Sequence, residues 1–303
     1  MTLARLVEND IRTTPLYHFL ASANELNLSP TVRIRQITNT EKYMTGDVPN
    51  RPEQRGYGWG FEHGYPNSFF VVDWLRTSPD QNDETVRVSA SLLMFKADVI
   101  GMELPWFIQA EFRSWQATSR SVLPDIDPTD LEPLSAANTG TRFPYVLNSG
   151  EEAQFTDFWR TTTSSRWEAN LIAASRRLIR AQRRMGFESD EDKIIDLVIS
   201  FEALVLNKNE RGKQRNLASR FSNLVGGSQQ QQIESDLLLA YDLRNDAVHD
   251  GLLDPTHLAQ LPNHPLALTV FLANVENYLR KGMRNYVTFI NSGESKNQII
   301  RHL

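Results

Sequence analysis

The spacing of hydrophobic residues changes near residue 150 of this chain, and that change limits the folds open to it. Before this point, apolar residues alternate with polar ones, as Val32 and Ile34 do with Arg33, which is the period of a half-buried strand. After it, apolar residues recur every three or four positions, which is the period of an amphipathic helix. The sequence therefore predicts an α+β protein in which a small, mainly antiparallel sheet precedes a helical bundle.

The predicted sheet lies between residues 31 and 115. Its strands are runs of aromatic and β-branched residues over Thr31–Ile37, Tyr57–Phe61, Ser68–Leu75 and Trp106–Trp115. Thr85–Lys96 fits either a strand or a helix, because its apolar residues satisfy both periods. Upstream of the sheet, Thr14-Pro15 predicts the start of a short helix. His63 lies among Trp59, Phe61 and Tyr65, which fit either a base-stacking surface or the core and loops of the sheet.

Residues 116–150 separate the two halves. They contain four prolines among many Ser, Thr, Asp and Asn residues, a composition that buries little apolar surface. We therefore expect an α+β accessory or sensor domain over residues 1–115, a linker over 116–150 and a helical domain over 151–303.

The helical domain is predicted to hold five or six helices. Their apolar stripes run from Trp167 to Met185, from Ile194 to Val205, from Leu217 to Val225, from Ile233 to Tyr241 and from Leu268 to Phe289. Because no solenoid period relates these segments, we expect them to pack as a single bundle.

Composition removes several classes of protein. The chain has no cysteine, which excludes disulfides, thiolate metal sites and a Cys nucleophile. No stretch approaches the roughly 18 apolar residues of a membrane helix, and the first residues lack a signal-peptide run, so we expect a cytoplasmic protein without membrane contact. A Gly-rich phosphate loop, a Gly-x-Ser-x-Gly elbow and a His-Glu-x-x-His helix are also missing from the sequence.

Basic residues gather in one part of the chain. Residues 160–220 hold 13 Lys and Arg against 8 Asp and Glu, although the whole chain has a net charge of −5. A basic stretch in an acidic protein can bind a polyanion at one place without adhering to it everywhere. The side chains that we expect to contact such a polyanion are Arg176, Arg180, Arg183, Arg184, Lys213 and Arg215. The alternative is a solvated helix face.

The segment Tyr241–Gly251 brings together a fixed cation, an amide and a titratable imidazole, as Arg244, Asn245 and His249. On a helix, Asn245 and His249 share a face, whereas Arg244 and His249 lie about 140° apart unless the helix ends there. Gly251 stands where a C′ glycine would end the helix and leave His249 free to move toward the guanidinium. An imidazole exchanges protons near neutral pH and a guanidinium grips phosphate oxygens, a combination that suits RNA cleavage by its own 2′-OH. The alternative is a histidine that only caps a helix end.

Other titratable residues near this motif support weaker hypotheses. Asp246, His249 and Asp250 have a helical spacing that could bind a metal ion, although two carboxylates and one imidazole are a sparse set. His257 and His264 flank a proline turn, and we expect both at the surface.

Four segments in a fixed order give the motif a context. They are Ala174–Ala181, Ile194–Leu206, Asn216–Gly226 and Tyr241–Gly251. In these segments residues 150–290 resemble the HEPN superfamily, and most closely its Apea-like branch. The polar residue that the family has after its arginine is Asn245 in this chain.

The resemblance implies a helical domain that forms a homodimer or higher homo-oligomer with two Arg-x4-His motifs at the interface. It implies a metal-independent endoribonuclease without a cofactor, which cleaves single-stranded or loop RNA with Arg244, Asn245 and His249. Glu202 matches the family's Glu-Ala-Leu run and is expected to pair with an arginine or to orient Arg244. Asp250 stands where the family often has glycine, so its carboxylate is expected to act on the imidazole or to crowd a phosphate.

The same resemblance implies a toxin or anti-phage defence effector. The N-terminal domain would then sense a phage-derived or regulatory partner, on family analogy alone. Two alternatives stay open: a non-catalytic HEPN module that binds a nucleotide or RNA or only dimerises, and a metal-dependent nuclease.

Overall fold

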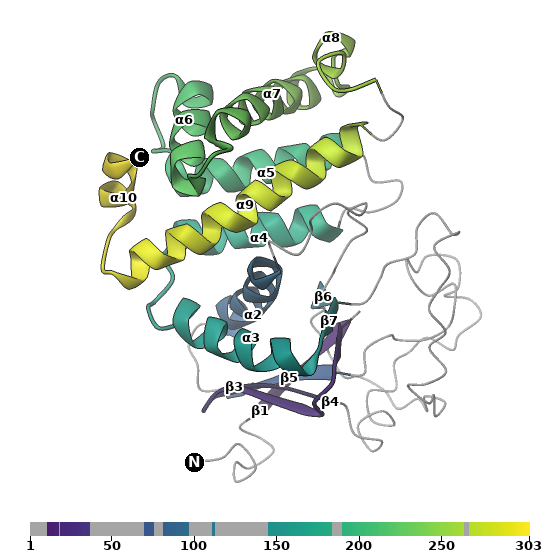
Figure 1. Cartoon of the computed structure of the whole chain (residues 1–303), viewed down its shortest axis with the longest axis vertical. Helices are drawn as coiled ribbons and strands as arrows, with labels where there is room; N and C mark the ends of the chain where they lie inside the picture. Colours follow the sequence, from purple (N-terminus) through teal and green to yellow (C-terminus); the bar gives the residue numbers. More distant parts are fainter. Residues whose placement is uncertain are drawn as a thin grey trace, which may run out of the picture. The chain divides into compact units, whose positions relative to one another are not determined.

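The computed structural model describes residues 11–17, 19–36, 70–75, 81–96, 111–112, 145–183, 190–263 and 267–303. The chain divides into two compact units. One comprises residues 1–81 and 108–157 and holds the strands; the other comprises residues 82–107 and 158–303 and is helical. The predicted α+β layout is therefore confirmed (Figure 1).

Five strands of the first unit form an antiparallel sheet. Their order is β3 (Glu25–Ser29), β4 (Val32–Gln36), β5 (Phe70–Leu75), β1 (Ile11–Tyr17) and β6 (Glu111–Phe112). Val32 and Ile34 are buried while Arg33 and Arg35 are partly exposed, as their alternation predicts. In a second, two-stranded sheet, β2 (Phe19–Ala21) pairs in parallel with β7 (Tyr145–Leu147).

The helix predicted to start at Thr14-Pro15 is wrong, because these residues lie in β1. Six residues of β1 pair with β5, and the β-branched Ile11, Thr13 and Thr14 suit a strand. In the described residues β6 pairs only with Leu16 and Tyr17, so the ladder on that side does not need an N–H from Pro15.

The boundaries of the units differ from the predicted ranges 1–115, 116–150 and 151–303. Residues 145–150 are ordered as β7 and the beginning of α3 (Ser149–Thr162), whereas 113–144 lie outside the described residues. Asn148 begins α3, since its Oδ1 accepts the backbone N–H groups of Gly150 (3.1 Å) and Glu151 (3.0 Å). The predicted strand Tyr57–Phe61 and the aromatic group around His63 also lie outside the described residues.

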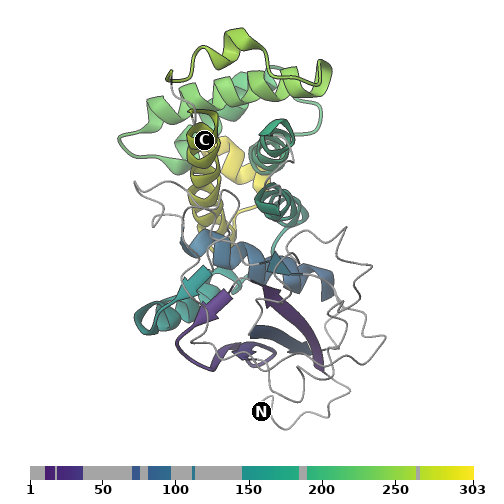
Figure 2. The same ribbon diagram turned by 90° about the vertical axis from the view of Figure 1, so that its right-hand side faces the viewer.

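The second unit consists of helices with the end of α3. They are α2 (Gln81–Phe95), α4 (Ala169–Arg183), α5 (Asp190–Val205), α6 (Lys213–Val225), α7 (Gln230–His249), α8 (Pro255–Leu258), α9 (Ala267–Asn291) and α10 (Lys296–His302). Within this unit α5 lies between α4 and α7, as Figures 1 and 2 both show. No helix in the described part of the chain combines the length and the apolar character needed to cross a bilayer.

Helix α5 forms the centre of the hydrophobic core. The stripe predicted for it is buried throughout, at Ile194, Leu197, Val198, Phe201, Leu204 and Val205. The ring of Phe201 meets that of Phe221 on α6 edge to face, with centroids 4.4 Å apart. The ambiguous segment Thr85–Lys96 belongs to helix α2, where Val88–Met94 are all buried, and a helix buried on every side shows no clean period.

Three charged side chains are buried together between α5 and α9. The Lys193 ammonium lies 3.3 Å from Oε2 of Glu276, and the Arg280 guanidinium contacts Oε1 of the same carboxylate. Burial opposes the ionisation of Glu276, but the charges of Arg280 and Lys193 together hold its pKa below the ordinary value. These residues therefore form an ionised group inside the bundle.

Candidate functional site

The predicted motif occupies the last two turns of α7. The helix buries Ile233, Leu237, Ala240 and Leu243, and it packs against α5, α6 and α9. It ends after His249: the N–H of Asp250 donates to the carbonyl of Asp246 (2.8 Å), and Gly251 turns the chain with a φ of +72°. A φ of this sign favours glycine, so the predicted C′ role of Gly251 is confirmed.

Arg244 is partly buried, and none of its contacts with the described residues carries a negative charge. Its Nη1 donates to Oδ1 of Asn245 (3.1 Å), and its guanidinium carbon lies 5.8 Å from the centroid of the Tyr241 ring. Its Nε is buried without a hydrogen-bond partner in the described structure. The guanidinium is thus held by an amide and an aromatic face, which fix its place without neutralising it.

Glu202 on α5 reaches this arrangement through Tyr241. The Tyr241 hydroxyl donates to Oε1 of Glu202 (3.2 Å), and the described residues include no ion pair between Glu202 and Arg244. Burial and the nearby Glu202 carboxylate raise the pKa of Tyr241, so its hydroxyl stays protonated and can donate. Direct pairing of Glu202 with Arg244 is therefore not observed; the two residues are linked by the Tyr241 side chain.

His249 and Asp250 are exposed at the end of the helix. His249 makes no hydrogen bond or ion pair with any described residue, Arg244 included. Because α7 stays helical through His249, the two side chains keep the separation expected from their spacing. One copy of the chain thus does not bring the guanidinium and the imidazole together. Val248 (46% exposed) and Leu252 (71% exposed) flank His249 and present apolar surface there.

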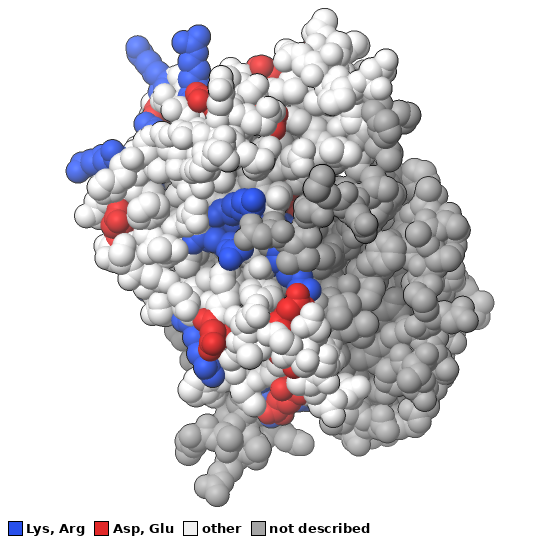
Figure 3. All heavy atoms as spheres, in the orientation of Figure 1, with Lys and Arg blue, Asp and Glu red and all other residues white. Residues whose placement is uncertain are grey.

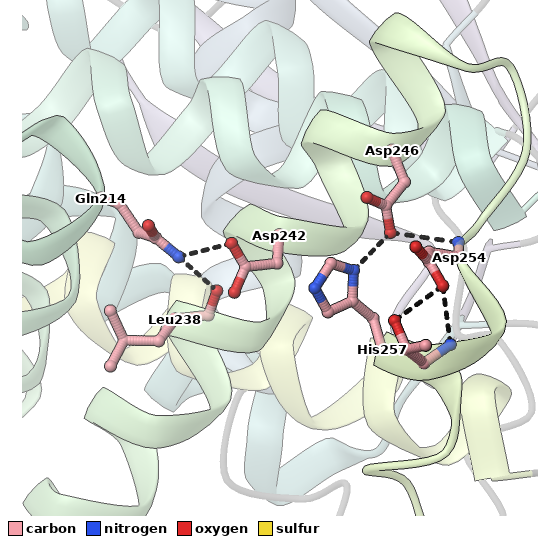
Figure 4. A network of polar contacts seen from close by, with 7 residues as sticks. Gln214, Leu238, Asp242, Asp246, Asp254 and His257 are labelled. Carbon is pink, nitrogen blue, oxygen red and sulfur yellow. Dashed lines mark hydrogen bonds and ion pairs between the residues drawn. The ribbon is translucent and has the colours of Figure 1, made fainter.

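A polar network that the sequence did not reveal lies on an adjacent face of α7 (Figure 4). Oδ2 of Asp246 accepts the backbone N–H of Asp254 (3.1 Å) and lies 2.7 Å from Nδ1 of His257. Asp254 begins α8, since its carboxylate accepts the N–H of Thr256 (2.7 Å). His257 lies partly exposed at the surface, as predicted, and is also the partner of the largely buried Asp246 carboxylate. The Asp254-Pro255 pair, typical of a helix start, was the one available sign that this segment is ordered.

This network changes the metal hypothesis for Asp246, His249 and Asp250. Asp246 contacts α8, while His249 and Asp250 are exposed and bind neither it nor each other through side chains. Within the described ranges, no three Asp, Glu, His or Cys side chains are grouped so that they could hold a metal ion.

The basic residues predicted to bind a polyanion fall into two sets. Lys213 and Arg215 are exposed on the first turn of α6, next to Gln214, whose Nε2 donates to Oδ1 of Asp242 on α7 (2.7 Å). Arg176 and Arg180 are exposed on α4, which packs against α5 on the side away from α7. The side chain of Arg183 and all of Arg184 lie outside the described residues.

Other basic residues of the stretch are balanced by acids. Arg177 pairs with Asp196 (2.6 Å) and Arg220 with Glu210 (2.6 Å). On the face drawn in Figure 3, Lys and Arg side chains project over α6 and the loop before it. That loop and turn carry Lys208, Arg211, Lys213 and Arg215, all of them exposed. The α6 set, beside α7, is therefore better placed for the site than the α4 set.

Comparison with known protein families, curated proteins and solved structures finds nothing that matches this chain.

Proposed function

We propose that the protein is a metal-independent endoribonuclease that cleaves single-stranded or loop RNA at the end of α7. The observation that carries this proposal is the state of Arg244. Its guanidinium is oriented by the Tyr241 ring and by Oδ1 of Asn245, and no carboxylate among the described residues pairs with it. A guanidinium that is held in place with its full charge can stabilise a phosphate whose negative charge increases in the transition state.

The chemistry is an internal transfer at phosphorus. A base removes the proton of the 2′-OH, the 2′ oxygen bonds to phosphorus, and the bond to the 5′ oxygen breaks as an acid protonates that oxygen. The products are a 2′,3′-cyclic phosphate and a 5′-OH, so neither water nor an oxidant is consumed. His249 would exchange the protons, Arg244 would stabilise the charge on phosphorus, and Asn245 would orient Arg244 or contact the phosphate.

The proposed site needs a second copy of the chain. Arg244 and His249 do not meet within one copy, and one imidazole is half of an acid and base pair. The exposed Val248 and Leu252 beside His249 offer apolar surface for a symmetric contact. A homodimer or higher homo-oligomer would place motifs of two copies around one RNA strand, with Lys213 and Arg215 guiding the strand.

The test is RNA cleavage in the presence of a chelator. We expect the wild type to yield ends with 2′,3′-cyclic phosphate, and His249→Ala to lose activity by roughly 10²–10⁴-fold with unchanged folding and oligomeric state. His302→Ala, which removes another exposed histidine, is the matched control and should cleave normally. Cleavage by His249→Ala at the wild-type rate would contradict the proposal, and loss of wild-type cleavage in chelator would indicate a metal-dependent nuclease.

The resemblance to HEPN proteins supports a biological setting. We propose a cytoplasmic toxin or anti-phage effector, whose N-terminal unit answers to a phage-derived or regulatory partner.

A second candidate is a non-catalytic HEPN module that binds RNA or a nucleotide, or only dimerises. Asp250 favours it, because a carboxylate follows His249 where the family often has glycine. RNA binding without cleavage, at a level equal in wild type and His249→Ala, would support this candidate. Asp250→Gly would separate the two, since it should increase cleavage if the carboxylate only impedes an active site.

A further inference from the structure

Asp246 holds both ends of the loop that follows His249. Its backbone carbonyl accepts the N–H of Asp250, and its side-chain Oδ2 accepts the N–H of Asp254. The Asp246 side chain is only 12% exposed, and a largely buried carboxylate with two good hydrogen bonds is a rigid anchor. The chain from Asp246 to Asp254 is thereby closed into a ring, and His249 is part of that ring.

His257 completes the anchor from α8. Its Nδ1 lies 2.7 Å from the same Oδ2, and Figure 4 shows its ring between Asp246 and Asp242. Helix α8 is only one turn long and packs against α7. So short a helix has little stability of its own, and its place depends on the contacts of its side chains.

We propose that Asp246 and His257 are a positioning pair that fixes the end of α7 and so holds the imidazole of His249 where the reaction needs it. This inference rests on the proposed function for its catalytic consequence. Neither residue touches the reacting atoms; each acts through the turn that carries His249. A displacement of about 1 Å at a reacting group can lower a rate by roughly 100-fold, so a loosened turn would be costly.

The pair also gives the anchor a pH dependence. The described charged groups that face His257 are Asp246 and Asp242 on α7 and Asp254 before α8. The hydrogen bond to Asp246 raises the pKa of His257 above its ordinary value of 6.5. Because the folded pKa is raised, the stabilisation is complete below pH 6.5 and is lost as the pH rises through the folded value.

The competing explanation is that the pair only stabilises α8. Both explanations predict a less stable protein when the pair is removed, so stability cannot separate them. Amide exchange at the end of α7 and the split between kcat and KM can, because only a positioning role connects the pair to His249.

The experiment uses the full chain with His257→Ala, His257→Asn and Glu234→Gln. The asparagine side chain places an N–H at about the distance of Nδ1 and cannot titrate. Glu234, on the same helix, makes no hydrogen bond or ion pair with the described residues and serves as the charge control. In His257→Ala we expect the amide hydrogens of Val248–Asp250 to exchange faster. We also expect kcat to fall by roughly 10- to 100-fold with little change in KM. His257→Asn should recover most of kcat, and the protection of its Val248–Asp250 amides should not fall as the pH rises through the folded pKa of His257, as it should in the wild type.

Two results would overturn the positioning role. One is wild-type kcat in His257→Ala despite a loosened α8, which would make the pair structural only. The other is unchanged amide exchange at Val248–Asp250 in that variant. The second result decides the question even if the wild type cleaves no RNA, so failure of the proposed function and failure of this inference are distinguishable.

Discussion

Two arginines of the helical unit, Arg280 on α9 and Arg244 on α7, are held in opposite ways. Arg280 is 1% exposed and contacts the carboxylate of Glu276, which also pairs with Lys193. Arg244 is partly exposed, and its contacts are an amide oxygen and an aromatic ring. One guanidinium is neutralised inside the protein, and the other is oriented while its charge remains available.

The difference follows from the cost of burying charge. An ion buried without a counter-ion costs several kcal/mol, so a fully enclosed arginine must have a carboxylate beside it. Arg244 keeps part of its side chain in water and needs none. A carboxylate does lie nearby, at Glu202, but it hydrogen-bonds to Tyr241 instead. Charge paired in the core thus stabilises the fold, whereas charge left unpaired at a helix end can bind a ligand.

The largest expected effect is a loss of stability in Glu276→Gln, which disrupts the buried group around Arg280. The substitution removes the negative charge that faces Arg280, and breaking such a buried pair costs about 3–5 kcal/mol. Urea unfolding measures it, with Glu234→Gln as a control expected to change stability by no more than about 0.5 kcal/mol. Equal stability of the two variants would show that Arg280 does not depend on its carboxylate.

A smaller loss is expected from Gly282→Ala, two residues after Arg280. A Cβ there would lie 2.1 Å from Cζ of Phe221, whose fully buried ring is already packed against Phe201. Overpacking costs about 1–3 kcal/mol, while alanine in place of glycine returns at most ~1 kcal/mol of helix propensity. We therefore expect a net loss of about 1–2 kcal/mol by thermal or urea unfolding.

Gly150→Ala is the matched control for that substitution. Gly150 also lies in a helix, but the nearest atom to its Cβ would be 3.5 Å away, at Oδ1 of Asn148. The change should leave stability unaltered or raise it. If Gly282→Ala behaved in the same way, the contact between α9 and α6 would be less tight than described.

The smallest expected effect is that of Tyr241→Phe, which changes the surroundings of the partly exposed Arg244. The hydrogen bond to Glu202 is lost, at about 0.5–1.5 kcal/mol, but the ring under Arg244 remains. If the proposed ribonuclease activity holds, RNA cleavage should therefore fall by less than tenfold, whereas Tyr241→Leu, which removes the ring, should reduce it further. If both variants cleave equally well, the aromatic face does not position Arg244.

Helices were predictable from the sequence where one face is buried. The stripes of α6 and α7 and the end of α7 at Gly251 follow from spacing, because a one-sided helix leaves a period of three and four. The sequence did not distinguish helix α2 from a strand, because this helix is buried on all sides around Leu92. The strand β1 was also missed, because a proline near a threonine resembles a helix start until the pairing with β5 is known.

The parts of the site that depend on long-range contacts could not be predicted. Arg244 and His249 were proposed as site residues from their chemistry and spacing, but nothing in the sequence joins Glu202 to Tyr241 or Asp246 to His257. Those contacts arise because α5 packs against α7 and because α8 returns beside α7. Local patterns report which residues share a helix face, and tertiary packing decides which neighbour each face meets.

The membership of α2 in the helical unit has a consequence for how the protein is made. Ala90, Leu93 and Met94 belong to the same core cluster as residues of α4–α7 and α9, yet the chain between them supplies β6, β7 and α3. On the ribosome, α2 therefore emerges long before the helices that cover it, and its apolar side chains are not buried by those helices until they have been made. A fragment that began at residue 151 would lack that helix and would leave its binding surface in the core open to water. The core of the helical unit is therefore complete only after α9 and α10 have been translated.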